Sequence, residues 1–484
     1  MRLSHRWAGA VLVSLCAICL TVQVLVRPAV GMADNGDFAK MAGPLALGPQ
    51  DPEEAETLFA AAFTYRYIKD DRYLYNSPFK DAAFLSSEFF LVKLARAAQK
   101  IVQPGPRFNI RWLGAVNAIF YLLAIALWIY ALSGRWRIYG GLFVILVWTD
   151  VAYVDYLNSF YMDTSAIISL VLAIAAGLHF VKDHSNRIFP VLMVLAGTLF
   201  VASKAQHVLP GLLLVPLFLA FAIWSRDRVA RLTWIGGSVL LAIGAYTVIG
   251  RVSEDWRRVA VFNAVFMHIT PRARDPLRTL QDLGLGRKEL PFVGMHAFLT
   301  NSPMQKPDWA RAFSARCNYR TLLFYYLTRP SETADLLYGD LSQAAPEMRP
   351  YADRSLEDGF PPYSTATRFI WWTGIRAFLL RHAPWHVILL TCATLLGALW
   401  LIFRSPPNRP FAALVLTTQT LAALEFAIAS LADGVDINRH LITFHAATEI
   451  SILLFAILVS RLYRCAVASQ SLAVPGAAVS APAR

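Results

Sequence analysis

Ten apolar segments along the chain constrain what it can fold into. They lie at 7–26, 112–132, 138–154, 164–181, 188–204, 207–224, 232–250, 385–403, 411–431 and 440–460. A helix needs about 20 apolar residues to cross the hydrocarbon core of a bilayer. In lipid, backbone polar groups must be paired within the protein, so only helices and closed barrels span it. The pattern predicts an all-α, polytopic transmembrane helix bundle.

The composition also favours a membrane protein. Of the 484 residues, 56% are hydrophobic and 16% are charged, and the mean hydropathy is +0.46. Soluble domains carry about 25% charged residues. The net charge of +13 lies largely in short loops, so topology explains it first and binding of anionic lipid or lipid phosphate second. We therefore expect membrane lipids as partners and no nucleic acid. The five cysteines show no spacing typical of a disulfide or a metal site.

Basic residues gather at alternate ends of the apolar segments. The set comprises Arg2, Arg6, Arg135, Arg137, Lys182, Arg187, Arg226, Arg228, Arg231, Arg404, Arg409, Arg461 and Arg464. Its acids are Asp183 and Asp227. Such an excess marks the cytoplasmic side. The sequence thus predicts a multi-pass protein of the cell inner (plasma) membrane with both termini cytoplasmic. We expect the first segment to be an uncleaved anchor, with a signal peptide cleaved after Ala33 as the alternative.

The segments divide the chain into four parts. Residues 1–250 form an N-terminal transmembrane bundle that includes a first outer loop at 27–111. Residues 251–384 form a larger outer region, and residues 385–464 hold the C-terminal transmembrane helices. The last part, 465–484, is rich in Ala, Ser and Pro, which predicts a disordered cytoplasmic tail.

Three helices are predicted outside the bundle. One begins at Asp51, where an N-cap acid precedes a proline and further acids. A second covers 83–101, and a third covers Phe369–Leu380. The second has apolar and charged positions and the third is apolar and aromatic, and we expect all three helices to lie along the membrane surface. Packing on the end of the bundle is an alternative for the first two.

Three acidic clusters are predicted to share the outer side: 34–37, 155–163 and 433–436. In the first, Asn35-Gly36 favours a tight turn that aims Asp34 and Asp37 at one point. A carboxylate there can act as a general base on a hydroxyl, or the two can hold a divalent cation. The alternative is a solvated turn that caps a helix beginning near Phe38.

Other polar residues at this side suit an anionic ligand. Lys204 can bind a phosphate as a point charge, and Arg439 suits bidentate phosphate recognition with His440 beside it. Their structural alternatives are a lysine that reaches the interface and an ordinary loop. Asp163 is either a second acid of the same cavity or a helix N-cap. Two acids within apolar segments, Glu425 and Glu449, are functional or make hydrogen bonds between helices.

The order and common sidedness of these motifs resemble the GT-C superfamily of membrane glycosyltransferases. More narrowly, four short motifs are similar to those of bacterial glycan-biosynthesis hexose transferases of the S-layer type. They are Asn158-Ser159-Phe160-Tyr161, Ser203-Lys204-Ala205-Gln206, Asn263-Ala264-Val265-Phe266 and Arg439-His440. The chain departs from the narrower pattern at Asp163-Thr164, where Glu-Pro is expected, and at Ala205, where Pro is expected.

The resemblance implies a hexose transfer from a polyprenyl-phosphate donor to a glycan or other lipid-linked or envelope acceptor on the extracytoplasmic face. It implies catalytic roles for Asp34, Asp37 and Asp163, which would also hold a divalent cation (Mg²⁺ or Mn²⁺) if one is used. It places the donor phosphate at Lys204, His207, Arg439 and His440. It places other substrate contacts at Asn158, Tyr161, Gln206 and Asn263.

Three other functions stay open at this point. A lipid-linked glycan polymerase or ligase would depend on arginines of the outer region, for which Arg251, Arg257 and Arg258 are available. A transporter would place its site near the bilayer midplane, often between inverted repeats. A non-enzymatic scaffold of envelope assembly would lack an acidic outer cavity.

Overall fold

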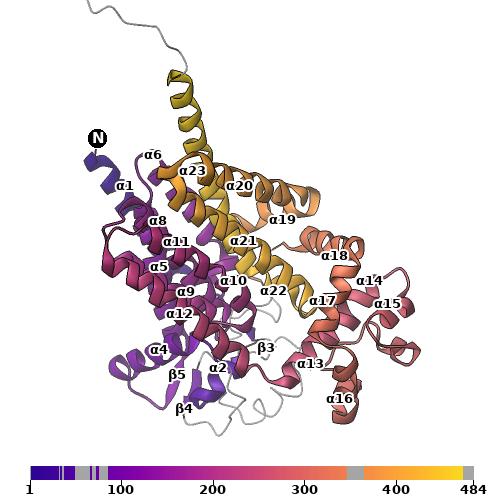
Figure 1. The fold of residues 1–484 in the computed structure, drawn as a ribbon. Helices are drawn as coiled ribbons and strands as arrows, with labels where there is room; N and C mark the ends of the chain where they lie inside the picture. Colours follow the sequence, from indigo (N-terminus) through magenta and orange to yellow (C-terminus); the bar gives the residue numbers. More distant parts are fainter. Residues whose placement is uncertain are drawn as a thin grey trace, which may run out of the picture.

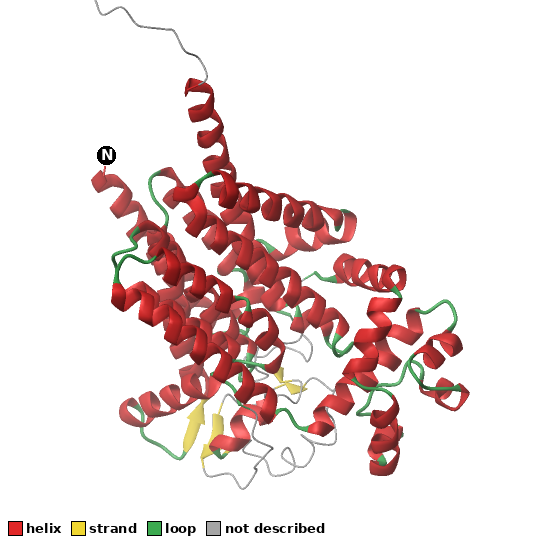
Figure 2. Ribbon diagram, viewed as in Figure 1, coloured by secondary structure: helices red, strands yellow, loops and turns green. Residues whose placement is uncertain are grey.

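The computed structural model describes residues 2–31, 33–34, 38–48, 66–67, 72–75, 85–345 and 365–472. Its regular structure is almost wholly helical (Figures 1 and 2). The helices of the bundle are α1 (Arg2–Val24), α5 (Ile110–Ala131), α6 (Arg135–Trp148), α8 (Asp163–Lys182), α9 (Ile188–Val201), α10 (Val208–Leu212), α11 (Leu214–Trp224), α12 (Arg228–Arg251), α20 (Trp385–Arg404), α21 (Arg409–Leu431) and α23 (Ile442–Leu472).

The predicted all-α polytopic membrane fold is confirmed. Within the described residues, eight helical spans are long and apolar enough to cross a membrane. Two further apolar segments, predicted at 138–154 and 188–204, form the shorter helices α6 and α9, which have 14 residues each. α23 continues to Leu472, so a helix covers the first residues of the segment for which the sequence predicts a disordered tail. Residues 473–484 lie outside the described residues.

Helix α8 forms the centre of the bundle. It packs against α5, α9, α21 and α23. Between Asp163 and Lys182 its residues are apolar, small or hydroxyl-bearing, apart from His179. A helix that is apolar on every side is stable when other helices surround it. The first residue of α8 is thereby fixed at one end of the bundle interior.

The first outer loop contains short strands as well as helices. β1 (Ala33–Asp34) pairs with β3 (Arg66–Tyr67), and β4 (Arg72–Tyr75) pairs with both β2 (Leu47–Gly48) and β5 (Arg107–Asn109), all antiparallel. Strands of two to four residues carry too little periodicity to be recognised in a sequence, and they were not predicted. The helix expected from Asp51 lies outside the described residues.

The helix predicted at 83–101 is α4 (Glu88–Val102). It buries Leu91, Val92 and Ala95 and exposes Phe90 and Ile101. The buried face packs on α5. α4 thus covers the bundle with one side and leaves apolar residues for lipid on the other.

The outer region has a core of its own. Its main helices are α13 (Glu254–Asn263), the π-helix η3 (Ala264–Ile269), α14 (Thr270–Arg272), α15 (Pro276–Asp282), α16 (Pro307–Arg316), α17 (Tyr319–Thr328), α18 (Pro330–Gln343) and α19 (Thr373–His382). Phe262, Phe266 and Phe313 lie at the centre of that core. The helix predicted at Phe369–Leu380 is confirmed as α19.

A buried polar network joins α19 to the bundle. Asp150 accepts hydrogen bonds from the backbone N–H groups of Trp371, Trp372 and Thr373 at 2.7, 2.6 and 2.9 Å, and from the Thr373 hydroxyl. The same side chain caps α7 (Val151–Val154) through the N–H of Ala152.

A second carboxylate completes this network. Glu449 accepts hydrogen bonds from Trp372 Nε1 at 2.5 Å and from the Tyr153 hydroxyl. Arg376 Nε donates to His445 Nδ1 at 3.3 Å. We call this set the α19 anchor; it comprises Asp150, Tyr153, Trp372, Thr373, Arg376, His445 and Glu449.

The two ends of the bundle differ. The N-terminus and the end of α23 lie at one end, while α2 (Phe38–Ala42), β4 and β5 lie at the other (Figure 1). The residues at the second end come from the first outer loop, the start of α8 and the outer region. This arrangement agrees with the alternation of charge in the sequence.

Candidate active site

The connection between α6 and α8 supports the site. Asn158 is fully buried, and its Nδ2 donates to the carbonyl oxygens of Val24 and Val30 at 3.0 and 2.9 Å. Gly31 has φ +89°, and a Cβ there would lie 1.8 Å from the carbonyl oxygen of Asp155. Because only glycine fits this contact, the start of the first outer loop runs directly along residues 155–158. The sequence predicts that Asn158 binds substrate. In the structure its amide N–H group binds the backbone of Val24 and Val30.

The next residues of the loop contact the same connection. α2 begins at Phe38, whose ring lies 5.4 Å from that of Phe160 and 5.0 Å from that of Tyr161. Asp34 belongs to β1, but its side chain lies outside the described residues, as does all of Asp37. The chain on both sides of these two acids is therefore bound to residues 155–161, and the catalytic roles of the acids stay predictions.

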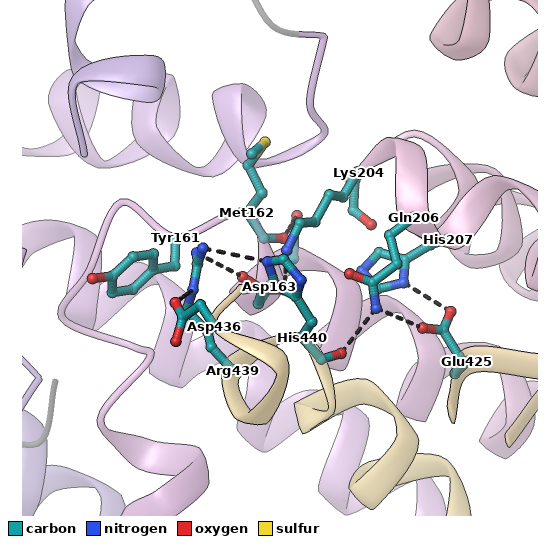
Figure 3. Close-up of polar contacts among 12 residues, drawn as sticks. Tyr161, Met162, Asp163, Lys204, Gln206, His207, Glu425, Asp436, Arg439 and His440 are labelled. Atoms are coloured by element: carbon teal, nitrogen blue, oxygen red, sulfur yellow. Dashed lines mark hydrogen bonds and ion pairs between the residues drawn. The ribbon is translucent and has the colours of Figure 1, made fainter. Parts of the chain in front are cut away.

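Two cations meet one carboxylate at the start of α8 (Figure 3). Lys204 Nζ lies 3.1 Å from Asp163 Oδ1, and Arg439 Nη1 lies 3.7 Å from Asp163 Oδ2. Arg439 Nε also donates to Asp436 Oδ2 at 2.7 Å, and its guanidinium stands 5.1 Å from the centroid of the Tyr161 ring. We call Asp163, Lys204, Asp436 and Arg439 the cationic cluster. Asp163 is the first residue of α8, and Lys204 directly precedes η2 (Ala205–His207). Arg439 lies in α22 (Ile437–His440).

The carboxylate of Asp163 does not cap its helix. The N-cap residue is Met162, without a side-chain bond, and the N–H of Ser165 is bound instead by Glu88 Oε2 at 3.1 Å. Asp163 is 1% exposed. A buried carboxylate is costly unless it is paired, and here two cations compensate it. Lysine offers a point charge and arginine a planar fork, so together they suit a phosphate group.

Asp163 is one of the three residues expected to hold a divalent cation if one is used. Two positive side chains face its carboxylate, and they would repel a metal ion. Among the described residues, no group of three or more His, Cys, Asp or Glu side chains is placed to hold one. The side chains of Asp34 and Asp37 lie outside the described residues, so the cation site stays a prediction.

Behind the cationic cluster lies a second set of polar residues (Figure 3). His207 Nδ1 lies 2.8 Å from Glu425 Oε1, and both side chains are fully buried. Gln206 Nε2 donates to Glu425 Oε2 at 3.2 Å and to the backbone oxygen of His440 at 2.9 Å. His440 Nε2 lies 3.5 Å from Arg439 Nη2. His207, expected at the donor phosphate, thus faces Glu425.

Asn263 ties the outer region to this end of the bundle. Its Nδ2 donates to Asp433 Oδ1 at 3.0 Å, and its Oδ1 accepts from the N–H of Ala297 at 2.9 Å. Burial raises the pKa of Asp433 to about 6, although Asn263, Lys40, Lys204 and Arg439 favour its ionised form. Asn263 therefore orients a carboxyl group that lies within electrostatic reach of the cationic cluster.

Glu88 is a residue whose place the sequence analysis missed. It is fully buried at the start of α4, and its Oε1 has no hydrogen-bond partner among the described residues. Burial raises the pKa of Glu88 to about 8. The available signal was its position, because residues 88, 91, 92 and 95 share the apolar face of α4. An acid on that face points to the bundle and not to solvent.

The chain was compared with known proteins. A family model described as the YfdI N-terminal transmembrane domain matches residues 2–471. No protein of curated function matches the chain. Two solved structures with a similar arrangement are oligosaccharyltransferases of Archaeoglobus fulgidus. One is AglB in complex with an inhibitory peptide and a dolichol-phosphate, at 12% identity and a TM-score of 0.40, covering 97% of this chain and 52% of that chain. The other is the apo form, at 14% identity and a TM-score of 0.40, covering 96% and 52%. The chain spans about half the length of these proteins.

Proposed function

The chain belongs to the YfdI N-terminal transmembrane domain family, and we propose that it is a membrane glycosyltransferase that moves a hexose from a polyprenyl-phosphate donor to a glycan or other envelope acceptor. The observation that carries the proposal is the convergence of Lys204 and Arg439 on Asp163 at the end of the bundle where the first outer loop lies. Such a pair of cations is suited to the phosphate of a lipid-linked sugar.

The proposed reaction needs a general base and a binding site for the leaving group. The acceptor hydroxyl attacks the anomeric carbon, and Asp34 or Asp37 takes its proton. The bond between that carbon and the phosphate oxygen breaks, and polyprenyl phosphate leaves with the electron pair. Lys204 and Arg439 stabilise the negative charge that develops on it, a contribution often among the largest in catalysis.

The remaining residues orient this chemistry. Asp163 is buried between the two cations, so we assign it the role of holding them in place. Tyr161 lies under the Arg439 guanidinium and against Phe38, which links the cationic cluster to the chain that follows Asp37. The excess of basic residues at the opposite end of the bundle supports an extracytoplasmic site in the inner membrane.

The polymerase or ligase alternative depends on arginines of the outer region, and two of the three candidates, Arg257 and Arg258, have defined contacts. Arg257 Nη2 donates to the carbonyl oxygen of Ile249 at 2.9 Å. Arg258 forms ion pairs with Glu254 and Asp255 at 2.8 and 3.0 Å. The Arg257 contact joins α13 to the end of α12, and the Arg258 ion pairs lie within α13, so these contacts hold both side chains on α12 and α13 and not at the cationic cluster. The transferase is the better supported of the two.

The test is to incubate the purified protein with a panel of polyprenyl-phosphate hexoses and to measure released polyprenyl phosphate. We expect release by the wild type, and its loss in Asp37→Ala or Asp34→Ala but not in Arg257→Ala. No release from any donor would overturn the proposal. An inactive Arg257→Ala variant beside active aspartate variants would favour the ligase.

A further inference from the structure

Glu425 is an acid buried within a membrane-spanning helix, α21. Its two oxygens serve consecutive residues of the turn after α9, with Oε1 on His207 and Oε2 on Gln206. An acid is costly to place within a membrane, and a carboxylate with such defined partners is a candidate for function.

The contacts of Glu425 connect the segments that carry the two cations. Gln206 is two residues from Lys204, and its amide also donates to the backbone oxygen of His440, the neighbour of Arg439. A single amide thus bonds α21 on one side and the last outer loop on the other. The position of Lys204 relative to Arg439 is set by this link and by their shared partner Asp163.

His207 strengthens the link from the other oxygen. Its ring is stacked on Phe200 at 5.1 Å, and its Nε2 has no hydrogen-bond partner among the described residues. Glu425 is therefore the described polar partner that fixes the ring. Removing one member of a buried hydrogen-bonded pair leaves the other without its partner, which is unfavourable.

We propose that Glu425 is the positioning residue of a lipid-phosphate site: by binding Gln206 and His207 together, it holds the turn that carries Lys204 against the loop that carries Arg439, so that both cations reach one phosphate. This inference rests on the proposed function. It concerns the affinity for the polyprenyl phosphate group and not the proton transfer.

The structure offers a matched control in Glu449. This residue is equally buried in a membrane-spanning helix, but its oxygens accept from Trp372 and Tyr153 in the α19 anchor. Glu449→Gln and Glu425→Gln therefore make the same chemical change at two fully buried positions, and one of the two is connected to the cations.

The experiment measures binding of geranylgeranyl phosphate to the purified full chain, together with donor KM and kcat. Without Glu425 the turn that carries Lys204 loses two hydrogen bonds, so we expect Glu425→Ala to bind about 10- to 100-fold more weakly. Glu425→Gln keeps one acceptor oxygen and should lose less. Donor KM should rise in both, with kcat changed less, and Glu449→Gln should bind as the wild type does.

A second variant covers the case in which Glu425→Ala does not fold. Gln206→Leu breaks the bond to His440 and leaves the pair of Glu425 and His207 in place, and it should also weaken binding. Equal binding by wild type, Glu425→Gln and Gln206→Leu would overturn the inference while leaving the proposed function intact. Equal weakening in Glu449→Gln would also overturn it. A wild type that binds no geranylgeranyl phosphate would instead refute the proposed function on which the inference rests.

Discussion

The cationic cluster and the α19 anchor are both built around buried carboxylates, but they satisfy them differently. Asp150 of the anchor accepts hydrogen bonds from three backbone N–H groups and a hydroxyl at the start of α19. Asp163 of the cluster faces two cations, and its Oδ2 has no hydrogen-bond partner among the described residues.

This difference separates a structural carboxylate, Asp150, from Asp163, which we propose belongs to a binding site. Neutral donors saturate Asp150, so its contacts are complete within the protein. The cations around Asp163 suit a second anion, because phosphate prefers the same donors as a carboxylate. The contrast teaches that the kind of partner, more than burial itself, identifies the functional acid.

The largest expected effect is on the cations of the cluster. Arg439→Ala and Lys204→Ala should each reduce transfer about 10²- to 10³-fold, the range for loss of one donor to a developing anion. The measurement is release of polyprenyl phosphate by purified protein. Arg381→Ala, at the end of α19, is the control and should stay near the wild-type rate. Full activity of Arg439→Ala would break the comparison, since the cluster would then be as structural as the anchor.

A paired change of the two aspartates should show the next largest effect. Asp150→Asn keeps one acceptor oxygen but weakens several buried bonds, so we expect it to reduce stability by about 1–3 kcal/mol. Asp163→Asn should mainly reduce binding of geranylgeranyl phosphate, because it loosens both cations. Thermal melting and lipid-phosphate binding are both measured on both variants. We expect Asp150→Asn to change mainly the melting temperature and Asp163→Asn mainly the binding. A result in which both variants lose stability and binding equally would show that the two regions do not differ.

Arginine-to-lysine changes test the same difference between the cationic cluster and the α19 anchor, with a smaller expected effect on transfer. Arg439→Lys keeps the charge but loses the planar fork, so transfer should fall by about tenfold. Arg376→Lys makes the same change in the anchor and should alter melting while leaving lipid-phosphate binding unchanged. Equal transfer rates for Arg439→Lys and the wild type would show that no fork-shaped contact with phosphate is used.

The smallest expected effect on transfer is that of Glu88, a buried acid that forms no ion pair with the described residues and whose change should act on the pH dependence of stability. Its carboxyl stays protonated in the folded protein up to a pKa of about 8, whereas the ordinary value is 4.5. The folded state thus binds more protons between these values, and stability should fall as pH rises from 4.5 to about 8. Glu88→Gln cannot ionise and should remove this part of the slope. Identical melting profiles against pH for Glu88→Gln and the wild type would contradict the assignment.

Much of the bundle could be predicted because lipid leaves few solutions for an apolar segment. The helices at 232–250 and 411–431 follow from length and composition alone, and α4 and α19 follow from their mixed faces. The strands of the first outer loop did not, because β1 and β3 have two residues each and depend on distant partners.

The site could be predicted in outline but not in its contacts. Topology places Asp163, Lys204 and Arg439 at one end of the bundle, and the structure brings the three together. Sequence spacing does not say that His207 turns to Glu425, which is 218 residues away, since helix packing decides this. Asp150 and Arg376 were missed for the same reason, as their partners come from distant segments.

The outer region has its own hydrophobic core, and it meets the bundle through a few polar ties and a small apolar cluster in which Leu341 and Leu380 pack with Ala429 and Phe444. Asn263 bonds Asp433 near its beginning, Tyr326 bonds the backbone oxygen of Leu431, and the α19 anchor holds its end. Because that core is separate from the core of the bundle, we expect substitutions within it to leave the contacts of Lys204 and Arg439 with Asp163 in place.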